Sequence, residues 1–281
     1  MKILKCNNPL KLKNKGNLEF VFIGTGTALG KKLFHNNCIM IKGDTHILVD
    51  FGMTGPEALR KSAGLAVLDI ENILITHSHA DHIGGLEYLA LSKRYSVNNT
   101  HNNKLKLIST SEYRNILWEM SLRGGMEWNE TNKSGKPLTF SDYFEHVKPK
   151  VISESPRLIV GTDFQGIKIE MFRTLHIPEN AETFADAFLT FGIFVDNRVL
   201  FTADTKFDKS LIDLYGHKSE VIFHDSSFEL NPVHASVQQL RQLPKTIKKK
   251  IYLMHYGDDW KKHNISDFGG LAKQGYRYIF D

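Results

Sequence analysis

Short hydrophobic runs recur along the whole chain and alternate with segments of helical periodicity. The runs are rich in Val, Ile, Leu and Phe, which is typical of buried strands. The predicted strands are residues 18–23, 38–41, 46–50, 73–76 and 105–109, then 167–174, 188–195, 199–202, 221–224 and 251–254. The predicted helices are residues 55–62, 85–94 and 111–122, then 209–215, 235–243 and 266–274.

This order of elements predicts an α/β fold with two mixed sheets. Both halves of the chain carry strands separated by helices, so we expect two sheets packed face to face with helices outside, an αββα sandwich. No Pro/Gly-rich linker divides the halves, which favours a single domain over residues 1–281. Residues 123–141 are polar and patternless, and they form either a loop or lid over a site or an ordinary surface insertion.

Three histidines and an aspartate lie between a predicted strand and a predicted helix. His77, His79, Asp81 and His82 form the pattern H-x-H-x-D-H. Such a group does not enter an apolar core unpaired, and its donors suit Zn²⁺, with Mn²⁺ or Fe as alternatives. A low-complexity histidine tract would be repetitive, and this spacing is not. The pattern therefore predicts a structured metal site on a strand-to-helix turn.

Four more residues with metal-binding side chains follow hydrophobic runs. Asp50, His176, Asp204 and His255 each come where a predicted strand ends. Taken singly, each is explained as a capping or turn residue. Taken with the first cluster, they predict further ligands or supports of the same metal site.

Composition narrows the surroundings in which this site works. The chain has 281 residues, of which 41% are hydrophobic and 24% charged, enough for a substantial core. Two cysteines, Cys6 and Cys38, form no CxxC motif, so we expect a reducing, cytoplasmic location. No long apolar run predicts a membrane span, and residues 1–20 show no secretory signal. The net charge of +5 weakly favours anionic substrates, although the lysine run at 245–250 is more typical of a solvated edge.

The order of these residues resembles the metal-binding motifs of the metallo-β-lactamase superfamily. The resemblance implies the αββα fold and two divalent metal ions, most simply Zn²⁺, with Mn²⁺ as the alternative. It implies the following ligands: His77, His79 and His176 for one ion, Asp81, His82 and His255 for the other, and Asp204 between them. It also implies that Asp50 orients the site through hydrogen bonds and that Asp81 contacts the attacking water. Two ions so placed activate water and clamp the oxygens of a phosphoryl group.

A later stretch is similar to the ribonuclease Z branch of this superfamily. His224 and Asp225 resemble the start of its His-Glu-Ala-Thr motif, with aspartate replacing glutamate, and His234 begins a triplet like its His-Ser-Thr motif. The resemblance implies that His224, paired with its acid, donates a proton to the leaving oxygen. His234 is the second candidate for this role, or a phosphate ligand. The turn at 24–27 also matches the branch, so we expect Gly26 and Thr27 to contact substrate.

The short spacing from His176 to Asp204 holds little more than two predicted strands. The tRNA-gripping arm of ribonuclease Z would not fit there, so tRNA is not an expected partner. Residues 22–28 and 253–258 look similar to the anti-Pycsar cyclic nucleotide phosphodiesterases of phages and their bacterial relatives. That resemblance implies a homodimer that hydrolyses 3′,5′-cyclic nucleotides, notably cyclic CMP and cyclic UMP, with cyclic AMP and cyclic GMP as further substrates. It implies a role against bacterial antiphage signalling, in the host cytoplasm if a phage encodes the chain.

Three other functions are weighed against this one. A tRNA 3′-processing endonuclease, or another nucleic-acid phosphodiesterase, is opposed by the missing arm. The His224–Asp225 pair argues against a lactonase or lactamase and for a phosphodiesterase, because an alkoxide leaving group benefits from protonation by a general acid. A binding module without activity would usually have lost ligands, and all seven are present.

Overall fold

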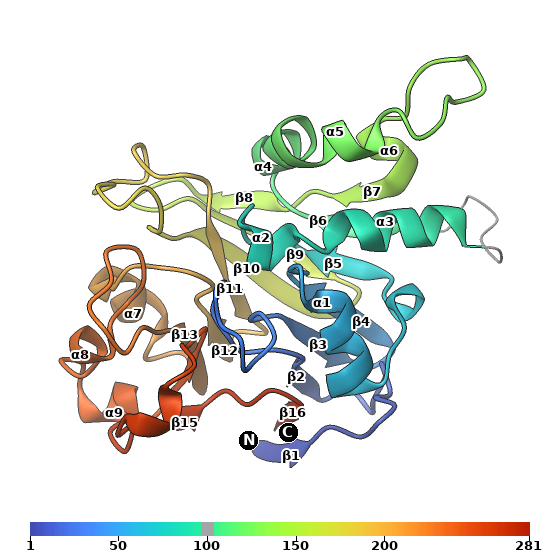
Figure 1. The fold of residues 1–281 in the computed structure, drawn as a ribbon. Coiled ribbons are helices and arrows are strands. Elements are labelled where there is room, and N and C mark those ends of the chain that lie inside the picture. The colour runs from blue at the N-terminus through green and yellow to red at the C-terminus, as the bar shows by residue number, and fades with distance from the viewer. Residues whose placement is uncertain (97–103) are drawn as a thin grey trace. The chain divides into compact units, whose positions relative to one another are not determined.

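The computed structural model describes residues 1–96 and 104–281. They form two compact units, each containing an eight-stranded sheet of described residues (Figure 1). The first unit comprises residues 1–24, 37–149 and 275–281, and the second comprises residues 25–36 and 150–274. The predicted α/β class with two mixed sheets flanked by helices is confirmed. The assignment of residues 1–281 to a single domain stays a prediction.

The first unit has a sheet in which antiparallel strands give way to parallel ones. Its strands, in spatial order, are β1 (Lys2–Lys5), β16 (Tyr276–Phe280), β2 (Leu18–Phe22), β3 (Cys38–Lys42), β4 (Thr45–Val49), β5 (Asn72–Leu74), β6 (Leu105–Ile108) and β7 (Phe144–Val147). Pairing is antiparallel from β1 to β4 and parallel from β4 to β7. Parallel neighbours end at the same edge of a sheet, so residues that follow β4 and β5 lie close together.

The helices of the first unit are short apart from α3. They are α1 (Gly55–Ala58), α2 (Ala80–Ile83), α3 (Leu86–Tyr95), α4 (Ser111–Ile116), α5 (Arg123–Met126) and α6 (Phe140–Tyr143). π-Helical turns at Leu59–Ala63 and Leu117–Leu122 extend α1 and α4, and Val67–Asp69 is a 3₁₀ turn. The predicted helices at 55–62, 85–94 and 111–122 are therefore confirmed.

The second unit has its own mixed sheet. Its strands, in spatial order, are β15 (Gly270–Leu271), β14 (Ile251–Met254), β13 (Val221–Asp225), β12 (Val199–Phe201), β11 (Phe191–Val195), β10 (Ile167–Arg173), β9 (Ile159–Phe164) and β8 (Lys150–Ser153). Pairing is parallel from β12 to β15 and antiparallel from β8 to β12.

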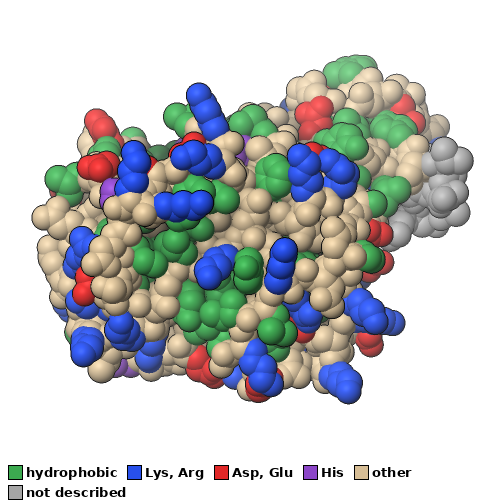
Figure 2. Space-filling model, turned by 60° about the horizontal axis from the view of Figure 1, so that its bottom comes forward, with side chains coloured by type: hydrophobic (Ala, Val, Ile, Leu, Met, Phe, Trp, Pro, Cys, Tyr) green, Lys and Arg blue, Asp and Glu red, His purple; other side chains and the backbone are tan. Residues whose placement is uncertain are grey.

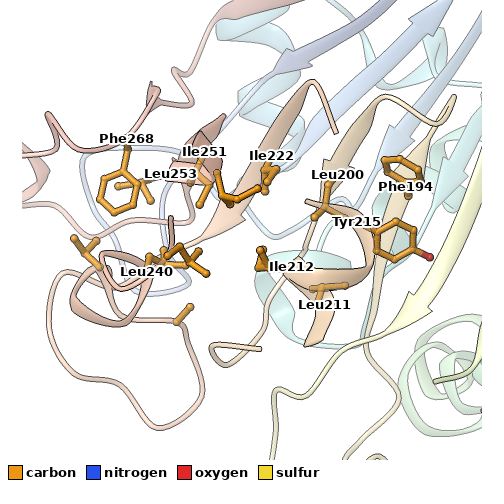
Figure 3. Close-up of a cluster of buried hydrophobic side chains, with 14 of the residues drawn as sticks. Phe194, Leu200, Leu211, Ile212, Tyr215, Ile222, Leu240, Ile251, Leu253 and Phe268 are labelled. Atoms are coloured by element: carbon orange, nitrogen blue, oxygen red, sulfur yellow. The ribbon is translucent and has the colours of Figure 1, made fainter. Parts of the chain in front are cut away.

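Helices α7 (Lys209–Tyr215), α8 (Val237–Leu240) and α9 (Lys245–Lys248) pack on one face of this second sheet, and Trp260–Lys262 is a 3₁₀ turn. Figure 3 shows strand residues such as Ile222 and Leu253 beside Leu211 and Leu240 from the helices. This packed face of β13 and β14 is hydrophobic, so a polar side chain on it is shielded from solvent.

Three sequence expectations fail. Residues 266–274 hold β15 and no helix, because the backbone here pairs with β14 and the Gly269 N–H bonds to the Ile251 carbonyl oxygen at 2.8 Å. Residues 123–141 begin with α5 and end with the start of α6, where Met126 and Phe140 are buried, so the expected loop is limited to residues 127–139. Predicted helix 235–243 shortens to the four residues of α8.

Besides β15, five strands of the described residues were missed. They are β1, β7, β8, β9 and β16, of which β1 and β8 are mostly exposed and lack a hydrophobic run.

The excess of basic residues is spread out on the face drawn in Figure 2, where Lys and Arg side chains stand apart among polar and hydrophobic ones. Among the described residues, no helix has both the length and the apolar character needed to cross a membrane.

Candidate functional site

The H-x-H-x-D-H residues of the first unit are crowded together after β5. His79 precedes α2, whose first turn carries Asp81 and His82. The His77 Nε2 atom is 3.0 Å from His79 Nδ1, and His82 Nε2 is 3.3 Å from an Asp81 carboxylate oxygen. The rings of His77 and His82 are 4.0 Å apart between centroids. His77, Asp81 and His82 are buried, so their polar atoms are turned toward one another rather than toward bulk water.

Asp50 supports this cluster from the end of β4. Its carboxylate accepts hydrogen bonds from the backbone N–H of Thr76 at 2.8 Å and from the Thr76 hydroxyl at 2.7 Å. The same carboxylate lies 2.7 Å from Nδ1 of His82. A proton on Nδ1 leaves Nε2 of His82 with its lone pair, which is the form a metal ligand needs. The contacts of Asp50 therefore agree with the orienting role that the motif implies.

Two residues that the sequence did not single out hold the same turn. Asn37 accepts a hydrogen bond from the Gly52 N–H at 3.0 Å and donates to the Asp81 carbonyl at 3.2 Å. A Cβ on Gly52 would lie 2.0 Å from that carbonyl oxygen, so only glycine fits. A glycine two residues after Asp50 is the one sequence feature that could have indicated this close approach. No local feature of the sequence indicated Asn37.

In the second unit, three candidate ligands converge at the ends of strands. His176 follows β10, Asp204 follows β12 and His255 follows β14. One oxygen of Asp204 lies 3.7 Å from His176 Nε2 and 3.5 Å from His255 Nε2. His176 Nδ1 is 2.8 Å from the Val233 carbonyl oxygen, to which it donates, so its Nε2 keeps the lone pair. Burial lowers the pKa of His176, although the nearby Asp204 charge acts to raise it. The lowered pKa favours the neutral imidazole.

Asp225 and His234 form an ion pair beside these residues. His234 Nδ1 lies 2.8 Å from an Asp225 carboxylate oxygen, which also accepts the Thr205 N–H at 2.9 Å. Burial lowers the pKa of His234, but the Asp225 charge and hydrogen bond raise it more, so the net shift is upward. Burial raises the pKa of Asp225, but His234 lowers it more. Both directions favour a charged pair, an imidazolium held by a carboxylate.

Asp204, Asp225, His234 and His255 together form a group whose donor atoms all lie within 4.8 Å of one another. Neutral imidazoles and carboxylates are the donors that Zn²⁺ and related divalent ions prefer. The side chains present in this unit therefore fit metal binding with an acid–base pair at its edge.

His224 has different surroundings from those expected. Its Nδ1 contacts the backbone carbonyl of Asp225 at 2.7 Å rather than a carboxylate. The residue is completely buried, and burial lowers its pKa. Alternate strand residues share a face, so His224 lies on the face of Ile222, opposite Leu253 of β14, against the helices. Burial therefore opposes the positive charge expected on His224, whereas the pKa of His234 is raised by Asp225.

A cavity of about 170 Å³ opens beside this group. Its lining comprises Thr27, Ser226, Ser227, Phe228, Glu229, Asn231, His234, His255, Gly257 and Asp259. Thr27 therefore lines this cavity, and its contact with substrate stays a prediction. Gly26 instead pairs its backbone with Phe34 and Asn36, and an added Cβ would lie 3.0 Å from Leu33. Phe228, Asn231 and Asp259 were missed, because no motif marks a cavity wall.

Comparison with known proteins identifies the family. A family model described as "Anti-Pycsar protein Apyc1" matches residues 18–278, nearly the whole chain. The chain belongs to the anti-Pycsar Apyc1 family. The Apyc1 family protein of Paenibacillus harenae is 34% identical over 238 residues, covering 84% of this chain and 88% of that protein. The one from Bacillus phage BSP38 is 33% identical over 266 residues, covering 92% of this chain and 96% of that protein.

A solved structure shares the fold of this Apyc1 family chain. The metallo-β-lactamase fold protein YhfI from Bacillus subtilis superposes with a TM-score of 0.67 and covers 94% of this chain and 99% of its own. It is only 14% identical, so this likeness concerns the fold alone. The predicted metallo-β-lactamase fold is thereby confirmed.

Proposed function

We propose that this Apyc1 family chain is a dinuclear metal-dependent phosphodiesterase that hydrolyses 3′,5′-cyclic nucleotides to nucleoside monophosphates. The main support is the Asp225–His234 ion pair, which lies beside the candidate metal ligands Asp204 and His255 and faces a cavity. Cleavage of a cyclic phosphodiester expels an alkoxide, which needs a proton, and a charged imidazole beside the metal donors supplies one. Cyclic CMP and cyclic UMP are the first substrates to test, because the family resemblance points to them.

The assignment of metal ligands follows the motifs. The seven ligands are His77, His79, Asp81, His82, His176, Asp204 and His255. Zn²⁺ is the preferred ion and Mn²⁺ the alternative. When bound, such ions would activate water and neutralise charge on the phosphate. Hydrogen bonds from His82 to Asp50 and from His176 to Val233 support the assignment, because each leaves Nε2 as the donor atom.

The protein's own side chains divide the remaining work. Asp81 orients the attacking water and takes its proton, as the motif implies. His234 enters the reaction protonated because Asp225 stabilises the imidazolium, and it gives its proton to the leaving ribose oxygen. Proton donation of this kind contributes roughly 10²–10⁴-fold to a rate. Thr27, in the cavity wall, contacts the substrate.

The test is incubation of metal-loaded protein with cyclic CMP, cyclic UMP, cyclic AMP and cyclic GMP, followed by chromatography of the products. We expect nucleoside monophosphates from at least the two pyrimidine substrates. Asp81→Ala serves as the inactive control, and folded tRNA serves as the competing substrate. Cleavage of tRNA without turnover of any cyclic nucleotide would overturn the proposal in favour of a nuclease.

We also propose that the chain acts as a homodimer in a bacterial cytoplasm, where it lowers cyclic-nucleotide signals used against phages. Relatives in both a bacterium and a bacteriophage support this setting. Light scattering at working concentration tests the dimer, and a monomer would contradict it. Mass spectrometry of cyclic CMP in cells that express the protein or Asp81→Ala tests the signalling role.

A further inference from the structure

One turn of the second unit, residues 231–234, carries the proposed proton donor and also contacts a proposed metal ligand. The Asn231 side-chain oxygen accepts hydrogen bonds from the backbone N–H of Val233 at 2.9 Å and of His234 at 3.1 Å. An asparagine that accepts from the backbone two and three residues ahead closes a rigid Asx-type turn. Asn231 also lies in the wall of the cavity and is partly buried.

The two residues held by Asn231 each reach a different functional side chain. Val233 offers its carbonyl oxygen to His176 Nδ1 at 2.8 Å, which sets the tautomer of a proposed metal ligand. His234 directs Nδ1 to Asp225 at 2.8 Å. The His234 ring is also close to those of His176 and His255, with centroid distances of 4.9 and 4.8 Å. A shift of this turn would therefore move His234 and, at the same time, break the hydrogen bond from His176 to the Val233 carbonyl oxygen.

We propose that Asn231 is a positioning residue that fixes His234 as proton donor and His176 as metal ligand through this single turn. The inference rests on the proposed function for the role of His234. Asn231 need not touch the reacting atoms, because the backbone of Val233 and His234 carries its effect. A misplacement of about 1 Å in a catalytic group costs on the order of 10²-fold in rate, so losing the turn should be visible.

The kinetic test compares Asn231→Ala with Asn231→Asp on two substrates. Cyclic CMP has a poor leaving group that needs the proton, whereas bis(4-nitrophenyl) phosphate has a good one that does not. We expect Asn231→Ala to lower kcat for cyclic CMP by about 10–100-fold, with a much smaller loss on the nitrophenyl ester. Asn231→Asp keeps the accepting oxygen and should restore most of the loss.

Asn264→Ala is the matched control. Asn264 also accepts a backbone N–H, from Ser266 at 2.9 Å, but it is exposed and does not line the cavity. This variant should behave as wild type on both substrates. Equal losses on both substrates in Asn231→Ala, or no loss on either, would overturn the positioning role.

A substrate-free measurement separates this inference from the proposed function. Nitrogen-15 NMR of the histidine rings reports whether His176 Nδ1–H is held, and titration of metal-free protein with Zn²⁺ reports the affinity. Asn231→Ala should speed exchange of that proton and weaken Zn²⁺ binding several-fold. A wild-type protein inactive on cyclic nucleotides would overturn the proposed function alone. Unchanged ring signals and Zn²⁺ affinity in Asn231→Ala would overturn the role assigned to Asn231.

Discussion

His224 and His234 show how surroundings select between two chemically identical side chains. His224 lies under the helices of the second unit, fully buried, with its pKa lowered by burial. His234 keeps partial access to the cavity and holds its charge against Asp225. A proton donor must be both charged and reachable. Only His234 meets both conditions.

The first prediction separates the two rings by substitution. His234→Ala should lower kcat for cyclic CMP by roughly 10²–10⁴-fold, because the leaving oxygen loses its acid. His224→Leu should keep turnover within a few-fold, since an apolar side chain suits the helix-facing side of β13. Steady-state kinetics, with circular dichroism to verify folding, checks both. A folded His224→Leu protein as slow as His234→Ala would contradict this ranking.

At the level of elements, α7 is fixed at its start by a buried ion pair. Asp208 caps the helix by accepting the Leu211 N–H at 3.1 Å, and it pairs with Arg157, which lies between β8 and β9. The two side chains are 11% and 5% exposed. Burial raises the pKa of Asp208, but Arg157 and the hydrogen bonds lower it more. Helix α7 in turn packs on the face of β13 that carries His224 and so helps to bury this side chain.

The second prediction concerns the pH dependence of stability. The lowered pKa of Asp208 adds stability at neutral pH, and that stability is lost as pH falls through the native pKa, below the usual value of 3.8. Asp208→Asn should cost about 3–5 kcal/mol at pH 7, since it leaves Arg157 buried and unpaired. Urea unfolding at pH 7 and at pH 3 measures the difference, which should shrink in acid.

Asp213→Asn is the control on the same helix, because its ion pair with Lys209 is exposed and should contribute at most about 1 kcal/mol. Equal costs for the two variants at pH 7 would contradict the assignment.

The third prediction concerns the segment that carries Thr27. The Asp258 carboxylate accepts the backbone N–H groups of Lys31 at 2.9 Å and Lys32 at 3.0 Å, which pins the loop after Thr27. Asp258→Ala should raise KM for cyclic CMP several-fold and change kcat less, because the cavity wall loosens while the acid stays in place. Steady-state kinetics measures both constants, with Asp267→Ala as a surface control. An unchanged KM would show that the loop holds its shape without this clamp.

At the level of the whole molecule, metal binding and stability are linked. Ions that bind the native chain and not the unfolded one stabilise folding, by about 2.7 kcal/mol when the free ion is at 100 times its Kd. The buried histidines and aspartates of both units make the native chain the better binder.

The fourth prediction is therefore that a chelator lowers Tm and abolishes turnover, and that added Zn²⁺ restores both. Thermal denaturation and elemental analysis provide the measurements, with two ions expected per chain. A Tm unaffected by chelation, in protein shown to have lost its metal, would contradict the link.

The sequence by itself determined the parts that depend on local pattern. Strands such as β2, β4 and β10 are hydrophobic runs, and α7 has helical periodicity bounded by Asp208. His77 and His79 lie between a strand and a helix as the pattern predicts, whereas Asp81 and His82 lie in the short helix α2, which begins earlier than expected. Family membership also came from the sequence, since motif order survives where overall identity is low.

The tertiary structure decided what depends on packing between distant segments. It placed His224 on the face of β13 that α7 to α9 cover, because alternate strand residues share a face. It placed Asp225 on the opposite face, where its carboxylate pairs with His234. It brought Thr27, Asn231 and Asp259 to one cavity wall. It also paired β15 with β14 inside residues 266–274, a segment expected to be helical, where the Gly269 N–H bonds to the Ile251 carbonyl oxygen. Such contacts join residues that are far apart in the chain, and the local sequence pattern around one residue does not show which distant residue it will contact.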